Sequence, residues 1–241
     1  MLFRSYLLIG LFVFYRREGA PKSQHFYLYC LASFLLYAFH YTGKLNNFDR
    51  VIYWGNVWAL LFAPALFLHF CLAFAGDAFS PRRRRLAAAA CYAPATLLLV
   101  SAAAAAMGML RTSLPLVELR LLLDRISFGL LALYLLLGIL ALELAYRRVA
   151  QAEDSLVRQQ MKWLKRGALW GAGPFLAFYA VPYLLGVVPK AWMGLAVLPL
   201  GLVPLTFAYA IVRYRLMDVD VIFRRGFAYS LATMTDRKSV V

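Results

Sequence analysis

Three histidines are the residues of this chain best suited to bind a metal or a haem, or to transfer protons. His25 begins an apolar run, His40 lies near the end of the same run, and His69 lies late in the next one. If successive runs cross a layer in opposite directions, His40 and His69 differ in depth by several helical turns. We therefore expect the histidines to lie apart, each hydrogen-bonded to a neighbour, and predict no metal or haem site.

Glu143 is the clearest acidic residue inside an apolar run, a setting in which ionisable groups are functional candidates. Arg147 follows at the i+4 position, where opposite charges pair on the surface of a helix. A local ion pair near the helix end is the preferred interpretation. A role in proton relay is the alternative.

Asn56, Tyr183 and Trp192 form the candidate ligand site. Asn56 lies about one turn inside the third apolar run, where an amide needs a partner on another helix or in a wet cavity. Tyr183 and Trp192 are expected near the same end of the molecule. The functional interpretation is a small pocket that opens to the outside, and the alternative is an interhelical hydrogen bond beside a belt of aromatic residues.

Motifs of known catalytic chemistry do not occur in the sequence. It has no phosphate-binding glycine loop, nucleophile elbow or metal-binding motif. Cys30, Cys71 and Cys91 lie in apolar runs without the spacing of metal ligands and are predicted to be small buried residues. We assign no catalytic residue, no metal ligand and no cofactor.

The composition is that of a membrane protein. Hydrophobic residues make up 63% of the chain and charged residues 15%, against roughly 45–50% and 25% in soluble domains. Crossing a hydrocarbon core of about 30 Å takes roughly 20 helical residues, and the apolar runs lack the alternation of a β-barrel. We predict an all-α fold, a polytopic transmembrane bundle of about seven helices. The expected spans are Leu2–Tyr15, His25–Thr42, Val51–Ala75, Leu86–Leu110, Ile126–Tyr146, Ala168–Val188 and Met193–Val212.

Basic residues orient this bundle. A net charge of +15 would suggest nucleic acid as the partner of a soluble protein, but here the charges lie between apolar runs. Seventeen lysines and arginines fall in the first, third and fifth loops and just after the seventh run, and six fall in the alternate loops. The positive-inside rule then places the N-terminus outside and the segment after the seventh helix inside, against the anionic inner leaflet. Nucleic acid is not an expected partner.

Several prolines lie inside the expected spans and are predicted to kink them. They are Pro64, Pro94, Pro174, Pro182, Pro199 and Pro204. Gly167 and Gly171 have the GxxxG spacing that permits close helix packing, although such spacing also arises by chance in runs of small residues. The basic fifth loop, Arg147–Arg166, is interpreted either as a helix on the inner leaflet or as extensions of helices five and six.

Three regions are expected along the chain. Residues 1–212 form the seven-helix sensor or anchor region, with a first helix that is expected to be truncated. Residues 213–225 form a basic cytoplasmic connector. Residues 226–241 begin a further apolar helix and end in a tail of prematurely ended or foreign sequence.

Three stretches of the chain carry a resemblance to a known family. They are Tyr41–Phe74 (YTGKLNNFDRVIYWGNVWALLFAPALFLHFCLAF), Arg158–Gly186 (RQQMKWLKRGALWGAGPFLAFYAVPYLLG) and Tyr209–Thr233 (YAIVRYRLMDVDVIFRRGFAYSLAT). Together they resemble the N-terminal multi-pass membrane sensor region of bacterial two-component histidine kinases, of the seven-transmembrane input-domain type. The resemblance covers nearly the whole chain.

The resemblance implies a sensor region in the bacterial inner membrane that passes a ligand or membrane stimulus to a cytoplasmic output domain. That domain would be a histidine kinase, or a serine phosphatase with a similar membrane region, so whether the parent is a kinase stays open. The family further implies a homodimer formed through the cytoplasmic domains and a response regulator reached through the output domain. None of the histidines carries over as the phospho-acceptor.

The expected path of the signal is the seventh helix and the connector that follows it. Its candidate residues are Arg213, Arg215, Asp218, Asp220, Arg224 and Arg225. The alternative function is a membrane transporter or channel-like bundle, in which kinked helices six and seven would gate a site near the midplane. The lack of charge at mid-membrane and of an inverted repeat weighs against that alternative.

Overall fold

The computed structural model describes residues 2–16, 21–39, 46–75, 81–109, 115–150 and 155–213, and every regular element among them is a helix. The first five elements are α1 (Leu2–Arg16), α2 (Pro21–Ala38), α3 (Asn47–Ala75), α4 (Pro81–Ala106) and α5 (Leu116–Ala150). The others are α6 (Ser155–Phe175), the π segment η2 (Leu176–Ala180), α7 (Val181–Leu184), the 3₁₀ segment η3 (Ala191–Gly201) and α8 (Leu202–Arg213). Because α6, η2 and α7 are continuous, and η3 continues into α8, these elements form seven rods. Each rod overlaps one of the expected spans, so the all-α prediction is confirmed.

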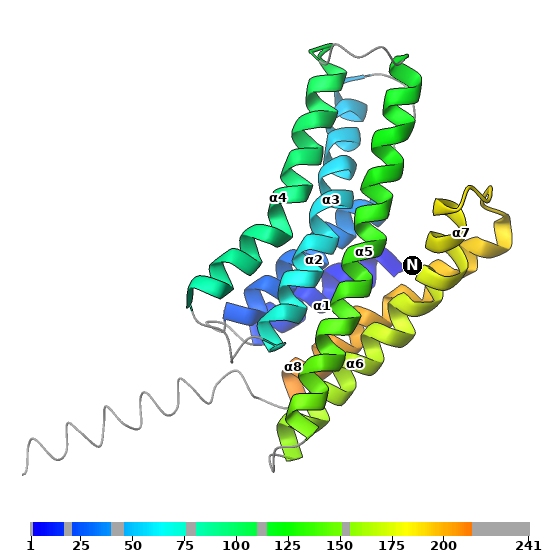
Figure 1. Ribbon diagram of the computed structural model, residues 1–241. Coiled ribbons are helices and arrows are strands. Elements are labelled where there is room, and N and C mark those ends of the chain that lie inside the picture. Colours follow the sequence, from blue (N-terminus) through cyan, green and yellow to red (C-terminus); the bar gives the residue numbers. More distant parts are fainter. Residues whose placement is uncertain are drawn as a thin grey trace, which may run out of the picture.

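Six of the rods form a closed ring. Around the ring, α1 contacts α2, α2 contacts α3, α3 contacts α5, α5 contacts α6, α6 contacts α8, and α8 contacts α1. The remaining helix, α4, packs on the outside of this ring against α3 and α5. In Figure 1, α3, α4 and α5 rise together at one end, while α6 and α8 lie beside the other half of α5. The ring therefore brings the last helix of the described chain against its first.

A cluster of phenylalanines fills the centre of the ring. Phe26 on α2, Phe67 and Phe70 on α3 and Phe207 on α8 are all buried, and the centroid of the Phe207 ring lies 5.4 Å from that of Phe70 and 6.0 Å from that of Phe67. Gly138 on α5 lies against the Phe67 ring at a point where a Cβ atom would clash. Aromatic packing thus holds α8 to α2 and α3, and the missing side chain of Gly138 lets α5 approach.

Local sequence signals explain where the helices begin and end. The side-chain oxygen of Asn46 accepts a hydrogen bond of 2.7 Å from the backbone N–H of Asp49, which caps the start of α3. Gly108 after α4 and Gly186 after α7 have φ of 69° and 89°. Such left-handed residues at helix ends are usually glycine. At Gly186 the backbone N–H of Val187 bonds back to the carbonyl of Pro182 over 2.9 Å, which closes a Schellman motif.

Helices six and seven depart from the regular spans that the sequence predicts. The sixth rod, which consists of α6, η2 and α7, widens at η2 into a π-helix. There the N–H of Val181 bonds to the carbonyl of Leu176, five residues back. The seventh rod, which consists of η3 and α8, begins as a 3₁₀ helix and becomes α-helical only at Leu202. Prolines lie at both irregular segments: Pro182 follows η2, and Pro199 lies inside η3. Neither residue can donate the backbone hydrogen bond that an α-helix requires at its position.

Membrane-spanning character is clear in four helices of the described chain. Asn47–Phe74, Arg85–Ala106, Val117–Ala150 and Ala191–Arg213 are long and apolar enough to cross a bilayer. Only 11% of the apolar window in Arg85–Ala106 is buried, against 56% in Asn47–Phe74. The helix outside the ring, α4, therefore has the largest share of apolar surface left for lipid.

The long helix α5 reaches beyond the hydrocarbon at one end at least. It has 35 residues, which at 1.5 Å each extend about 52 Å, whereas the core of a bilayer is about 30 Å thick. The helix continues to Ala150, and α6 begins again at Ser155. Of the two interpretations of the basic fifth loop, the structure thus agrees with extensions of helices five and six.

Candidate functional site

A cavity of about 370 Å³ lies between α3, α4 and α5, at the end of the molecule where α4 ends and α5 begins. Its lining follows the spacing of one face on each helix, i, i+3, i+4 and i+7, so three helix faces converge on it. The lining residues are Arg50, Tyr53, Val57, Leu60, Leu61, Ala102, Ala105, Ala106, Arg120, Leu123, Asp124 and Ser127.

Charged side chains gather at one end of this cavity. Arg50 lies in the first turn of α3, and Arg120 and Asp124 lie in the first turns of α5, and all three residues are exposed. The guanidinium carbon of Arg120 lies 5.1 Å from the centroid of the Tyr53 ring, a cation–π contact between α5 and α3. The rest of the lining is mostly leucine, valine and alanine. The cavity is therefore amphipathic, with charged and apolar side chains on its walls.

The outer site predicted from the sequence has different neighbours. Asn56 donates a hydrogen bond of 2.8 Å from Nδ2 to the carbonyl oxygen of Phe39, just after the end of α2. Tyr183 packs edge-on against Phe128, with 4.9 Å between ring centroids, and Trp192 is 58% exposed. None of the three residues lines the cavity, and these contacts do not join Asn56 to Tyr183 or Trp192. Their role as a ligand site stays a prediction.

The sequence carries a signal for the cavity in the spacing of residues on two helices. Arg50, Tyr53 and Val57 share one face of α3, and Arg120, Leu123 and Asp124 share one face of α5. In each helix an arginine near the helix start is followed by apolar residues on the same face. This pattern in the sequence indicates the helix faces to which the lining residues belong.

Two histidines meet, contrary to the expectation that all three lie apart. The rings of His25 and His69 are 4.3 Å apart between centroids. The Tyr92 hydroxyl lies 3.2 Å from Nε2 of His25 and 3.0 Å from Nδ1 of His69. The hydroxyl can donate to one ring nitrogen and accept from an N–H of the other, which links α2, α3 and α4. His40 lies outside the described residues.

The expectation was wrong because it compared the depths of His40 and His69, whereas the pair that meets is His25 and His69. His25 is near the start of α2 and His69 near the end of α3, and these ends adjoin when two successive helices run in opposite directions. Groups of three or more metal-ligating side chains are not found among the described residues. Two imidazoles and a phenol make a polar contact between three helices.

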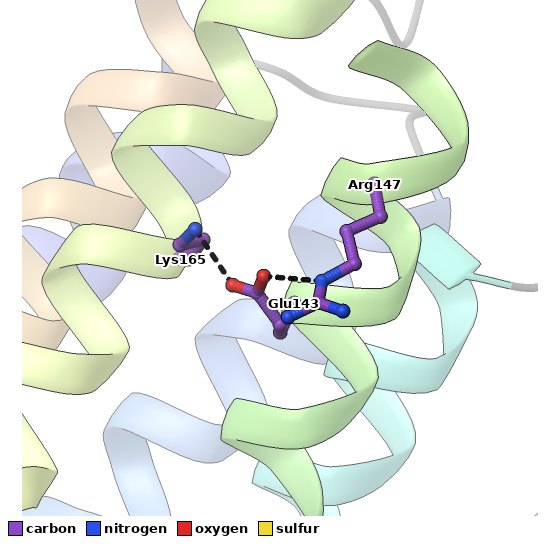
Figure 2. A network of polar contacts seen from close by, with 3 residues as sticks. All are labelled: Glu143, Arg147 and Lys165. Carbon is purple, nitrogen blue, oxygen red and sulfur yellow. Dashed lines mark hydrogen bonds and ion pairs between the residues drawn. The ribbon is translucent and has the colours of Figure 1, made fainter. Parts of the chain in front are cut away.

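Glu143 forms the ion pair predicted with Arg147, at 2.8 Å between Oε1 and Nε. Figure 2 shows that its second oxygen points to Lys165 on α6, at 2.6 Å from Nζ. Lys165 Nζ also lies 4.4 Å from the centroid of the Tyr146 ring. Glu143 therefore joins α5 to α6, a connection that the sequence did not indicate because Lys165 belongs to the next helix.

The last helix is tethered to its neighbours at three levels. Tyr6 on α1 donates a hydrogen bond of 2.7 Å from its buried hydroxyl to the carbonyl of Leu200. That carbonyl would accept from residue 204 in an α-helix, but Pro204 has no N–H. At the other end of α8, the side chain of Gln160 on α6 donates to the carbonyl of Ala210 over 3.3 Å. This carbonyl is one of the last four of α8, which lack partners within the helix.

Between these two hydrogen bonds the Gly167 and Gly171 pair packs directly on α8. A Cβ atom on Gly171 would lie 2.5 Å from Cγ2 and 3.2 Å from the backbone nitrogen of Val203, and one on Gly167 would clash with Thr206. The GxxxG spacing thus marks a real close approach of helices. Of the predicted signal segment the structure describes Arg213, exposed at the end of α8, while Arg215, Asp218, Asp220, Arg224 and Arg225 lie outside the described residues.

The chain was compared with protein families, curated proteins and solved structures. Residues 2–220 match the family model described as the N-terminal 7TM region of histidine kinase. No curated protein and no solved structure matches. The match includes all ten helical elements of the described chain and nearly all of its length. This chain therefore belongs to the family of N-terminal seven-transmembrane regions of histidine kinases.

Proposed function

We propose that the chain is the sensory input region of a bacterial two-component histidine kinase, located in the inner membrane. All seven rods cross the bilayer, with the N-terminus outside and the end of α8 inside. The family match over residues 2–220 is the observation that carries this proposal. The distribution of basic residues supports the orientation, and the closed ring of helices explains how the shorter rods are retained in lipid.

The proposed output lies beyond α8. A stimulus that binds at the outer end of the bundle, or a change in the membrane, favours one arrangement of helices, and it shifts the equilibrium only by its difference in affinity for the two arrangements. The shift leaves through η3 and α8 into residues 213–225, whose basic groups hold to the anionic inner leaflet. The output is a cytoplasmic kinase domain that dimerises and phosphorylates a response regulator.

The tether between Gln160 and Ala210 supports this route, because it fixes the inner end of α8 to α6. Gln160 is 3% exposed and pairs with a helix-end carbonyl, so it restrains the point from which the connector starts. Interhelical hydrogen bonds in membranes contribute about 0.6 kcal/mol on average, which corresponds to a factor of roughly three in a two-state equilibrium. Loss of this bond is thus expected to shift the balance of the kinase.

The test uses the full-length parent protein in proteoliposomes. Gln160→Leu is expected to change the basal rate of autophosphorylation by about threefold or more, because the carbonyl of Ala210 is released. Gln159→Leu is the matched control, since Gln159 is the adjacent residue and is exposed, and it should keep the rate within about twofold. Equal rates in both variants and the parent, with both variants inserted and folded, would contradict the proposed route.

A transporter or channel-like bundle is the second candidate. The observation in its favour is the irregular pitch of helices six and seven, where the π segment η2 and the 3₁₀ segment η3 interrupt the α-helix. Broken helices of this kind line transport sites in other membrane folds. Solute-dependent current or flux through liposomes that contain the chain would favour this candidate over the sensor.

A further inference from the structure

The cavity between α3, α4 and α5 is lined by two cationic groups and one carboxylate. Within the described part of the chain, neither the guanidinium of Arg50 nor that of Arg120 has a carboxylate within ion-pair distance. Asp124 is the one carboxylate among the lining residues, one turn from Arg120 on the same helix face. The cavity lining therefore carries two positive charges and one negative charge, a net charge that suits a single anionic group.

Apart from the charged groups, the lining is apolar except for the hydroxyls of Tyr53 and Ser127. Leu60 and Leu61 of α3 and Leu123 of α5 form the leucine part of the wall, and three alanines at the end of α4 complete it. A volume of about 370 Å³ lies near the lower end of the range for small-molecule pockets, roughly 300–1,000 Å³. The space suits one hydrocarbon chain and is too small for both chains of a phospholipid.

From these features we propose that the cavity binds a single-chain amphiphile with a monoanionic head, either a carboxylate or a phosphodiester. The head lies between Arg50 and Arg120, which offer charge-assisted hydrogen bonds, and the hydrocarbon chain lies along the leucines. The alanine face of α4 leaves the room for that chain. The ligand class deepens the proposed sensory function, since it names the kind of stimulus that the outer end would detect.

The geometry also explains how occupancy would matter for the bundle. The cavity is made by three helices, and Arg120 links two of them through Tyr53. An anion between the guanidiniums would strengthen the attachment of α5 to α3, and a chain below it would hold α4 at its present distance. Because α5 also contacts α6, a change at the cavity reaches the helix that restrains α8.

Photolabelling of the 241-residue chain in phosphatidylcholine nanodiscs tests the proposal. The probe is a decanoate that carries a diazirine near its methyl end, with labelled peptides mapped by mass spectrometry. We expect saturable labelling of residues 57–61, 102–106 and 123–127. Unlabelled decanoate should compete, whereas decyltrimethylammonium and decanol, which have the same chain length, should compete at least about tenfold less well.

Variants separate the roles of charge and space. The double variant Arg50→Gln/Arg120→Gln should lose labelling by at least about tenfold, and Arg125→Gln, an exposed arginine of α5 outside the lining, should not. Ala105→Leu should also abolish labelling, because it fills the cavity and leaves both arginines in place. Three results would overturn the proposal. They are full labelling of the double variant, competition by the cationic amphiphile equal to that of decanoate, and labelling spread uniformly along lipid-facing α4.

A further arm identifies the source of the head group. Stronger competition by lysophosphatidylglycerol than by decanoate assigns the site to a membrane-borne phosphodiester, and the reverse order assigns it to a free carboxylate. Failure of either competitor to displace the probe contradicts the ligand class. The experiment contains no kinase domain, so its failure would leave the Gln160 test of the proposed function unaffected.

Discussion

At the scale of single residues, polar side chains in this protein serve mainly to join helices. Tyr92 contacts two histidines, Glu143 contacts two cations, and Tyr6 contacts a carbonyl beside a proline. In lipid no water replaces a lost partner, so each of these groups needs a neighbour inside the bundle. Polar residues that the sequence marks as functional candidates are in this molecule largely the connections between its helices.

Tyr6→Phe tests this view with the removal of one oxygen atom. The carbonyl of Leu200 would lose its side-chain donor, and Pro204 offers no N–H in its place, so we expect a loss of about 1 kcal/mol in the free energy of unfolding, within the roughly 0.6–1.7 kcal/mol known for interhelical hydrogen bonds. Titration with SDS in mixed micelles measures it. Tyr15→Phe is the control on the same helix, at a position 70% exposed, and should change the free energy by less than about 0.5 kcal/mol. Equal effects of both substitutions would refute the role of the Tyr6 hydroxyl.

Prediction of contacts from the sequence succeeded within helices and failed between them. The pair of Glu143 and Arg147 follows from i+4 spacing alone, whereas Lys165 and the meeting of His25 with His69 depend on which helices are neighbours. Spacing fixes the relation of residues on one helix because the helix is rigid. It carries no information on the rotation of one helix against another, so it does not predict which residues line the cavity between α3, α4 and α5.

At the scale of elements, apolar run length located the helices but not their pitch. The spans were found because a bilayer requires a minimum length of apolar helix. The π segment after Pro174 and the 3₁₀ segment before Pro204 remained unseen, although prolines indicated kinks there. A proline shows where an α-helical hydrogen bond is lost, but the packing of neighbouring helices decides how the backbone adapts.

The packing of α6 on α8 gives an element-scale prediction from two glycines. Gly171→Ala places a Cβ atom against the side chain and backbone of Val203, so we expect the free energy of unfolding to fall by about 1–3 kcal/mol. Gly173→Ala, whose Cβ would have its nearest neighbour at 3.9 Å, should leave stability unchanged or raise it by up to about 1 kcal/mol. Unfolding of both variants in mixed micelles gives the comparison, and a stabilised Gly171→Ala would exclude the close approach.

At the scale of the whole molecule, the described helices form a ring whose last member contacts its first. The cavity between α3, α4 and α5 lies at one end of this ring, and the Glu143 and Gln160 contacts lie toward the other. Composition and charge predicted a helical membrane bundle, and the family match agrees with it. The order of helices around the ring could not be predicted, because every apolar run is equally suited to any place in it.

The measurement that tests this account most directly is the topology of the chain in the membrane. Single cysteines are introduced for Arg82, Met109, Arg148 and Lys190, all exposed, in a background where Cys30, Cys71 and Cys91 are replaced by alanine. Intact cells are treated with a maleimide that does not cross the membrane. We predict labelling at positions 109 and 190 in intact cells, and at positions 82 and 148 only after permeabilisation. Labelling that places positions 82 and 148 on opposite faces would contradict both the threading of the chain and the sensory function built on it.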